Sequence, residues 1–244
     1  MQNNPIGVFD SGIGGTTVLK AVQSLLPHED YVFFGDSKNC PFGTKSPEEL
    51  KVIVKNAVDF LLKKQVKLII VACNTATTQA IDFLRKTYPD IPFVGTEPAI
   101  KLACDSGKEN LVLLSTEGTA HSSRTEELIK NNIKAEQKII NLPCLGLAEV
   151  IETRNLDAIR QNLAENFSHI ENPAGADVVI LGCTHYPLVR EEIQKFFPNA
   201  VLIDGGEGVA RQTKRLLTER GLLNPKQSQG TVEYHFSKKI TPKV

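Results

Sequence analysis

Short apolar runs alternate along the chain with longer stretches in which apolar residues recur every three or four positions. The short runs are typical of buried strands, and the longer stretches, such as 47–65 and 156–170, are typical of amphipathic helices. Residues 227–244 also show an alternating strand pattern, although they carry no recognisable chemistry. The apolar runs predict eight strands, at 6–9, 31–35, 67–72, 92–95, 110–115, 137–141, 177–182 and 200–204.

The predicted strands are apolar on both faces and alternate with helices, which favours an α/β fold with mainly parallel sheets covered by helices. Two segments, 67–81 and 177–189, resemble each other. Each contains an apolar strand, a small residue, a cysteine, and then polar residues that open a helix. This similarity suggests two similar α/β halves that face each other, each presenting one cysteine.

Polar residues follow most of the predicted strands. In open α/β sheets a ligand binds beyond the carboxyl ends of the strands, so these loops are where we expect function. They are rich in hydroxyls, amides and thiols and poor in basic side chains. The loops read DSGIGG, GDSKNCPFGT, CNTATT, GTEPA, STEGT and CTHYP.

Composition narrows the class of protein. The chain has 244 residues, 41% hydrophobic residues and a formal net charge of zero. Without a basic stripe or a long charge run, nucleic acid and anionic membranes are disfavoured as partners. The longest apolar run, 68–73, is too short to span a bilayer, and the N-terminus lacks the apolar core of a signal peptide. We therefore expect a cytoplasmic protein.

The five cysteines are an odd number in a compartment that we expect to be reducing, which argues against a disulfide framework. They form no CxxC pair, which argues against a zinc ribbon or a thioredoxin-type motif. Cys73 and Cys183 each follow a strand and begin a helix, where the helix N-terminus favours a thiolate. A lone cysteine is more often a small buried hydrophobe, but two in equivalent places favour chemistry. We interpret Cys104 as a packing residue, and we leave Cys40 and Cys144 unassigned and expect them to be inert.

Three kinds of chemistry suit two thiols that face each other. The first is redox exchange, and the second is zinc ligation together with His185, for which the ligand set is thin. The third is proton transfer at a stereocentre, in which one group removes a proton from one face of a carbon and the other delivers a proton to the opposite face.

In this order and spacing, the motifs GVFDSGIGG, GDSKNCPFGTKS, VACNTAT, VGTEPAIK, STEGT and LGCTHYPL resemble those of the bacterial glutamate racemases. The resemblance runs from about residue 6 to residue 204. It implies cofactor-independent interconversion of L- and D-glutamate, for peptidoglycan synthesis. It also implies two similar α/β domains with the active site in the cleft between them. We assign 1–96 plus 208–244 to the first domain and 97–207 to the second.

The resemblance also implies roles for individual residues. Cys73 and Cys183 would be the two bases, assisted by Asp10, His185 and Glu152, with Glu149 as the competitor of Glu152. Phe42 stands where a tyrosine is usual in the family. The substrate-binding residues implied are Asp10, Ser11, Phe42, Gly43, Asn74, Thr75, Thr116, Thr119, Thr184 and His185.

We expect no metal and no cofactor. A pyridoxal mechanism would need a Schiff-base lysine and a phosphate cup, and of the strand-end loops only 36–45 carries lysines, neither of which has such a setting. The expected partner is L- or D-glutamate, and a homodimer is possible. The alternatives are a sister racemase, a one-cysteine decarboxylase or isomerase of the same superfamily, an inactive ligand-binding module, and a dinucleotide-binding protein. The last is disfavoured because the glycine-rich turn of this chain does not complete the GxGxxG motif of such proteins.

Overall fold

The computed structural model describes residues 2–238, and within them the strands form two sheets in which every pair of neighbours is parallel. The eight predicted strands are confirmed, and a further strand, β9, lies in the tail. Residues 239–244 of the tail pattern lie outside the described residues. The strands are β1 (Ile6–Asp10), β2 (Tyr31–Gly35), β3 (Leu68–Val71), β4 (Phe93–Gly95), β5 (Asn110–Ser115), β6 (Lys138–Pro143), β7 (Val178–Gly182), β8 (Val201–Asp204) and β9 (Val232–Phe236).

One sheet has the order β4-β3-β1-β2-β9. Apolar side chains of β1 and β3 point to both faces of this sheet and enter two separate cores. One core is closed by α2 and α3 and the other by α1 and α10, and we call this unit the five-stranded lobe. Its helices are α1 (Thr16–Leu25), α2 (Pro47–Lys63), α3 (Asn74–Thr87) and α10 (Gly206–Glu219), with a short 3-10 helix, η1 (Phe42–Thr44).

The other sheet has the order β6-β5-β7-β8 and is also covered on both faces. We call this unit the four-stranded lobe. Its helices are α4 (Ile100–Asp105), α5 (Glu117–Ala120), α6 (Ser123–Asn132), α7 (Leu147–Thr153), α8 (Leu156–Phe167) and α9 (Arg190–Phe196), with the 3-10 helices η2 (Pro173–Gly175) and η3 (Tyr186–Val189).

Local sequence explains the helix boundaries. In α2, the Ser46 side chain accepts a hydrogen bond from the Glu49 N–H, the Glu49 carboxylate accepts one from the Ser46 N–H, and Pro47 stands in the first turn. This capping box satisfies two N–H groups that a helix start otherwise leaves free. In α8, the Asn155 side chain accepts hydrogen bonds from two N–H groups of the first turn. Both helices therefore begin at the residue that the periodicity predicts.

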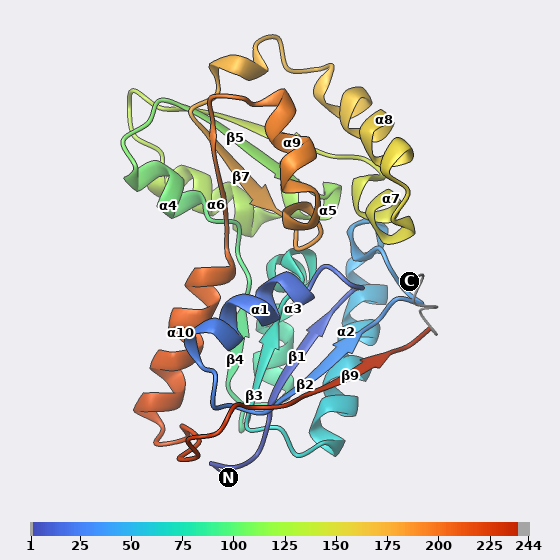
Figure 1. The fold of residues 1–244 in the computed structure, drawn as a ribbon, viewed down its shortest axis with the longest axis vertical. Helices are drawn as coiled ribbons and strands as arrows, with labels where there is room; N and C mark the ends of the chain where they lie inside the picture. The colour runs from blue at the N-terminus through green and yellow to red at the C-terminus, as the bar shows by residue number, and fades with distance from the viewer. Residues whose placement is uncertain (1, 239–244) are drawn as a thin grey trace.

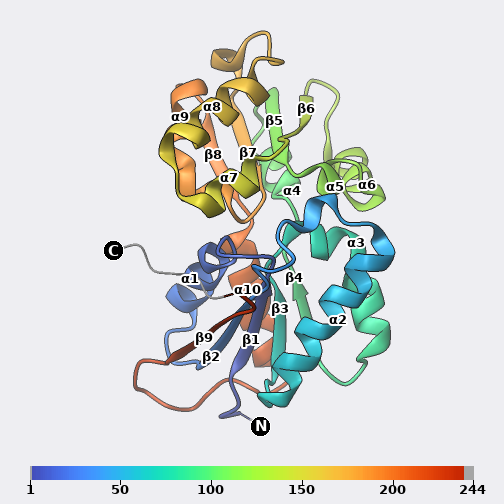
Figure 2. The same ribbon diagram turned by 90° about the vertical axis from the view of Figure 1, so that its right-hand side faces the viewer.

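The lobes stack along the long axis of the molecule, and the carboxyl ends of the central strands point toward the junction (Figure 1). The chain crosses between them twice, from β4 to α4 and from β8 to α10 (Figures 1 and 2). The predicted fold class, with two similar parallel α/β units, is confirmed. The residue boundaries that we assign to the two domains remain a prediction.

None of the helices in residues 2–238 combines the length and the apolar character that a membrane crossing needs.

Candidate functional site

The glycine-rich turn after β1 is organised by Asp10, which is fully buried. Its Oδ2 accepts hydrogen bonds from the N–H groups of Gly12 (3.0 Å) and Gly15 (2.9 Å). Its Oδ1 accepts one from the hydroxyl of Thr184, in the other lobe, at 3.1 Å. Burial raises the pKa of Asp10, while the charge of His185 and these hydrogen bonds oppose the rise. Asp10 thus shapes its own turn and joins the two lobes.

The glycines of this turn allow side chains of the other lobe to come very close. A Cβ on Gly12 would collide with the Glu152 carboxylate, and one on Gly14 would lie 2.5 Å from His185 Nδ1. The N–H of Ile13, between them, donates a hydrogen bond to Glu152 Oε1 at 2.7 Å. The backbone itself is therefore a wall of the site, and a side chain at either glycine would push the lobes apart.

Cys183, His185 and Glu152 form a continuous chain of contacts in the four-stranded lobe. The sulfur of Cys183, directly after β7, lies 3.7 Å from His185 Nδ1, and His185 Nε2 lies 2.6 Å from Glu152 Oε1. Burial alone would lower the pKa of His185, but its contacts with Cys183, Cys40 and Glu152 raise that pKa well above its ordinary value. Burial raises the pKa of Glu152, but the hydrogen bond with His185 and its charge outweigh burial, so that the pKa of Glu152 is lowered. The pair thus favours an imidazolium beside the sulfur and a carboxylate behind it.

Cys73 occupies the matching place in the five-stranded lobe, between β3 and the first residue of α3. It is 5% exposed. Burial raises the pKa of the Cys73 thiol to about 12, and the charges of Asp10 and Cys183 add to the rise. The Ser11 side chain and the backbone of α3 act in the opposite direction. Cys73 and Cys183 thus occupy equivalent positions after strands of the two lobes.

Three hydroxyl groups meet where α3 faces α5. Thr75 Oγ1 lies 2.8 Å from Thr116 Oγ1 and 3.3 Å from Thr119 Oγ1, and Thr116 and Thr119 lie 3.2 Å apart. A Cβ on Gly43 would lie 2.8 Å from Thr116 Cβ, so the turn of η1 borders the same cluster. Four of the predicted substrate-binding residues therefore come together across the junction of the lobes.

Two other predicted substrate-binding residues point elsewhere. The ring of Phe42 is buried in the core between the five-stranded sheet and α2. The side-chain amide of Asn74 donates a hydrogen bond to the carbonyl of Thr96 at 3.1 Å. From these positions, the backbone of either residue is better placed than its side chain to meet a ligand.

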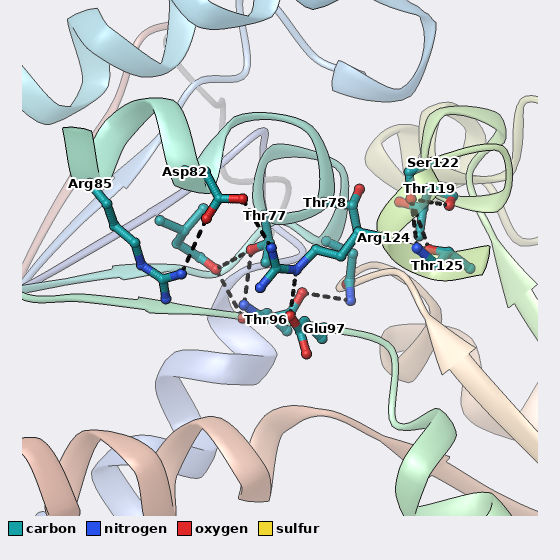
Figure 3. A network of polar contacts seen from close by, with 12 residues as sticks. Thr77, Thr78, Asp82, Arg85, Thr96, Glu97, Thr119, Ser122, Arg124 and Thr125 are labelled. Carbon is teal, nitrogen blue, oxygen red and sulfur yellow. Dashed lines mark hydrogen bonds and ion pairs between the residues drawn. The ribbon is translucent and has the colours of Figure 1, made fainter. Parts of the chain in front are cut away.

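An ion-pair network ties the lobes together on the side of α6 (Figure 3). The Arg124 guanidinium reaches from α6 to the Glu97 carboxylate at 2.5 Å and to Asp82 of α3 at 3.3 Å. Glu97 lies in the first crossing between the lobes. The junction is thus held by this network and by the buried hydrogen bond between Thr184 and Asp10.

Cys40, which the sequence analysis leaves unassigned, lies beside the His185–Glu152 pair. One ligand atom each from Cys40, Glu152 and His185 all lie within 4.8 Å of one another. In the sequence, the position of Cys40 in a polar loop after a strand indicates that it lies at the edge of the sheet where ligands bind. Cys104, in contrast, belongs to α4 and packs in the core of the four-stranded lobe, as predicted. Glu152 is the acid that contacts His185, whereas Glu149 lines a small cavity together with Gly43 and Thr116.

The chain is similar to proteins of a known family. Residues 12–213 match the family described as Asp/Glu/hydantoin racemase. The chain is 42% identical over 236 residues to a glutamate racemase of Clostridium botulinum (strain Alaska E43), covering 95% of this chain and 90% of that protein.

Two solved structures are similar along nearly the whole chain. The crystal structure of glutamate racemase from Francisella tularensis in complex with D-glutamate matches with a TM-score of 0.81 and 30% identity, over 98% of this chain and 90% of that one. Escherichia coli glutamate racemase, in complex with L-glutamate and the activator UDP-MurNAc-ala, matches with a TM-score of 0.80 and 32% identity, over 98% and 91%.

Proposed function

The chain belongs to the Asp/Glu/hydantoin racemase family, and on that premise we propose that it interconverts L- and D-glutamate by two-base proton transfer between Cys73 and Cys183. The relatives named above are glutamate racemases, and two of them are described with D-glutamate or L-glutamate bound. Following the family resemblance, the D-glutamate would serve peptidoglycan synthesis.

In the proposed reaction, glutamate lies with its α-carbon between the two sulfurs. One sulfur, as thiolate, takes the α-proton from its face of the carbon, and the other, as thiol, gives a proton to the opposite face. The first sulfur ends as thiol and the second as thiolate, so protons and charge balance and the reverse reaction exchanges the roles. No electron pair leaves the substrate, and the only bonds that change are C–H and S–H.

The observation that carries the proposal is the unequal setting of the two thiols. His185, whose pKa is raised, lies 3.7 Å from Cys183 Sγ, and an imidazolium there attracts a negative sulfur. Cys73 has a pKa raised to about 12, with Asp10 nearby, and so favours the thiol. A two-base reaction needs one sulfur as thiolate and the other as thiol at its start, and the two settings differ in this direction.

The α-proton of an amino acid is very weakly acidic, so the enzyme must also stabilise negative charge that develops on the α-carboxylate. Cys73 directly precedes α3, and Cys183 is separated from η3 by Thr184 and His185. N–H groups at helix starts are fixed donors that favour an anion. The Thr75, Thr116 and Thr119 hydroxyls are suited to a carboxylate as well.

Deuterium exchange tests the proposal. Purified protein is incubated with L-glutamate or D-glutamate in D2O, and α-deuterium and inversion are measured separately. The unmodified protein should produce the opposite enantiomer with deuterium at the α-carbon. Folded protein that gives neither product contradicts the proposal, and parallel runs with aspartate test the substrate.

Single serine variants sharpen the test. Cys73→Ser and Cys183→Ser should each lose inversion, because only one face of the carbon then has a thiol. The remaining cysteine can still exchange the α-proton of the enantiomer that it faces whenever it is in its thiolate form, so each variant should label one enantiomer only, and the two variants should label opposite ones. Cys104→Ser, a buried cysteine outside the site, is the matched control. Inversion that survives in either site variant would argue for a one-base mechanism.

A further inference from the structure

Cys40 is a half-buried thiol beside the His185–Glu152 pair that the proposed reaction does not use. It lies in the loop between β2 and η1, in the five-stranded lobe, whereas Glu152 belongs to α7 and His185 precedes η3. The three residues therefore meet only because the lobes meet. A Cys40 sulfur, a Glu152 carboxylate oxygen and a His185 ring nitrogen all lie within 4.8 Å of one another.

Thiolate, imidazole and carboxylate are together the ligand set of a Zn²⁺ site. With bonds of roughly 2.0–2.3 Å, two ligands of one tetrahedral ion lie about 3.3–3.8 Å apart. Donor atoms at up to 4.8 Å must therefore close by about 1 Å, which rotations of the half-buried Cys40 and Glu152 side chains toward the buried His185 can supply. Three protein ligands would leave a fourth position for water.

Glu152 is already oriented for such a role. Among residues 2–238, both hydrogen bonds that its carboxylate accepts, from Ile13 N–H and from the His185 ring, fall on Oε1. Oε2 therefore remains for a cation, while the Ile13 N–H holds the carboxylate in place. Such outer contacts orient metal ligands and strengthen their binding.

We propose that Cys40, Glu152 and His185 form an inhibitory site for a soft divalent cation such as Zn²⁺. Each ring nitrogen of His185 already faces a partner, Nδ1 toward Cys183 and Nε2 toward Glu152. A cation bound to Nδ1 displaces the contact with Cys183, and a cation bound to Nε2 displaces the contact with Glu152. Binding thus removes His185 from Cys183 or from its supporting carboxylate and stops proton transfer. The inhibition rests on the proposed racemase function, whereas the binding does not.

Binding is tested on metal-free full-length protein without any activity measurement. Co²⁺ is the spectroscopic probe, because a thiolate ligand gives it an intense near-ultraviolet charge-transfer band, and Zn²⁺ is then added to displace it. The unmodified protein should develop this band with one Co²⁺ per chain and lose it on Zn²⁺ addition. Cys40→Ser should lose the band and weaken Zn²⁺ binding at least ~100-fold. Cys104→Ser is the matched control and should keep both.

Inhibition is then measured by titrating Zn²⁺ into the racemase assay, with each variant normalised to its own metal-free rate. Zn²⁺ should abolish activity of the unmodified protein and of Cys104→Ser, EDTA should restore it, and Cys40→Ser should need at least ~100-fold more Zn²⁺. Equal sensitivity of Cys40→Ser and the unmodified protein would overturn the inference, because the cation would then act at Cys73 and Cys183. Absence of the Co²⁺ band in the unmodified protein would overturn it too. A Cys40-dependent band in protein without racemase activity would support the site and contradict the proposed function.

Discussion

Replacement of Asp10 by asparagine and by alanine separates its structural work from its charge. Asp10 is fully buried and accepts three hydrogen bonds, from the Gly12 and Gly15 N–H groups and from the Thr184 hydroxyl. In Asp10→Asn, the amide oxygen can accept from both N–H groups and the amide NH₂ can face the Thr184 oxygen. In Asp10→Ala, all three acceptor contacts are lost.

The magnitudes follow from these contacts. A buried donor left without a partner costs about 1–3 kcal/mol, so two N–H groups in Asp10→Ala predict a loss of about 2–6 kcal/mol, while the Thr184 hydroxyl can rotate to another acceptor. Hydrogen bonds to a charged acceptor are roughly twice as strong as neutral ones, so Asp10→Asn should lose no more than about 2 kcal/mol. Against a total stability of about 5–15 kcal/mol, the alanine variant is strongly weakened and the asparagine variant stays folded.

Urea unfolding of both variants beside the unmodified protein measures these differences. The expected order of stability is Asp10, then Asn, then Ala. An alanine variant as stable as the asparagine variant would refute the reasoning, because the turn would then not depend on the acceptor.

Activity of the folded Asp10→Asn variant reports on the charge. If the carboxylate assists proton transfer, kcat should fall by about 100-fold or more, whereas a role in holding the substrate ammonium should appear mainly in KM. Loss of the Asp10 charge should also lower the pKa of Cys73, since that charge helps to raise it. An unchanged pH dependence of Cys73 alkylation in this variant would argue against the electrostatic coupling.

Two further predictions concern charge and burial elsewhere. Lys67 and Glu29 form an ion pair at 2.5 Å, with side chains that are 1% and 2% exposed. Lys67→Met leaves the Glu29 charge buried without its partner and should lower the free energy of unfolding in urea by about 3–5 kcal/mol, and adding Glu29→Gln should restore most of that loss. A loss below about 1 kcal/mol in Lys67→Met would contradict this prediction. Because the pKa of Cys73 is raised to about 12, the thiolate fraction of this residue should grow about tenfold per pH unit. Alkylation of Cys73 by iodoacetamide in ligand-free protein, measured by mass spectrometry, should therefore accelerate steadily from about pH 7 to about pH 10. A rate that reaches a plateau near pH 8.5 would instead indicate a thiol with an ordinary pKa.

The strands and the places of the two cysteines could be predicted because both depend on local sequence. An apolar run identifies a buried strand, and the residue after it must lie at the sheet edge where ligands bind. The positions of Cys73 after β3 and of Cys183 after β7 could be predicted from these apolar runs. Their roles as bases remain a prediction that the serine variants test.

The neighbours of Glu152 and Cys40 could not be predicted in this way. Glu149 and Glu152 lie one turn apart in α7, and which of them meets His185 depends on how that helix packs against η3. The bond between Ile13 and Glu152 joins residues 139 positions apart and exists only when the lobes dock. Cys40 gained its neighbours from the same docking, which no local pattern in its loop encodes.

The order of strands also has a consequence for biosynthesis. Every strand of the four-stranded sheet lies between residues 110 and 204, in one uninterrupted stretch. The five-stranded sheet takes four strands from before that stretch and β9, at 232–236, from after it. A ribosome therefore delivers the complete set of strands for the second sheet while the first still lacks its edge. The strands of the four-stranded lobe, which carries Cys183, are therefore all synthesised before the five-stranded lobe, which carries Cys73, receives its last strand.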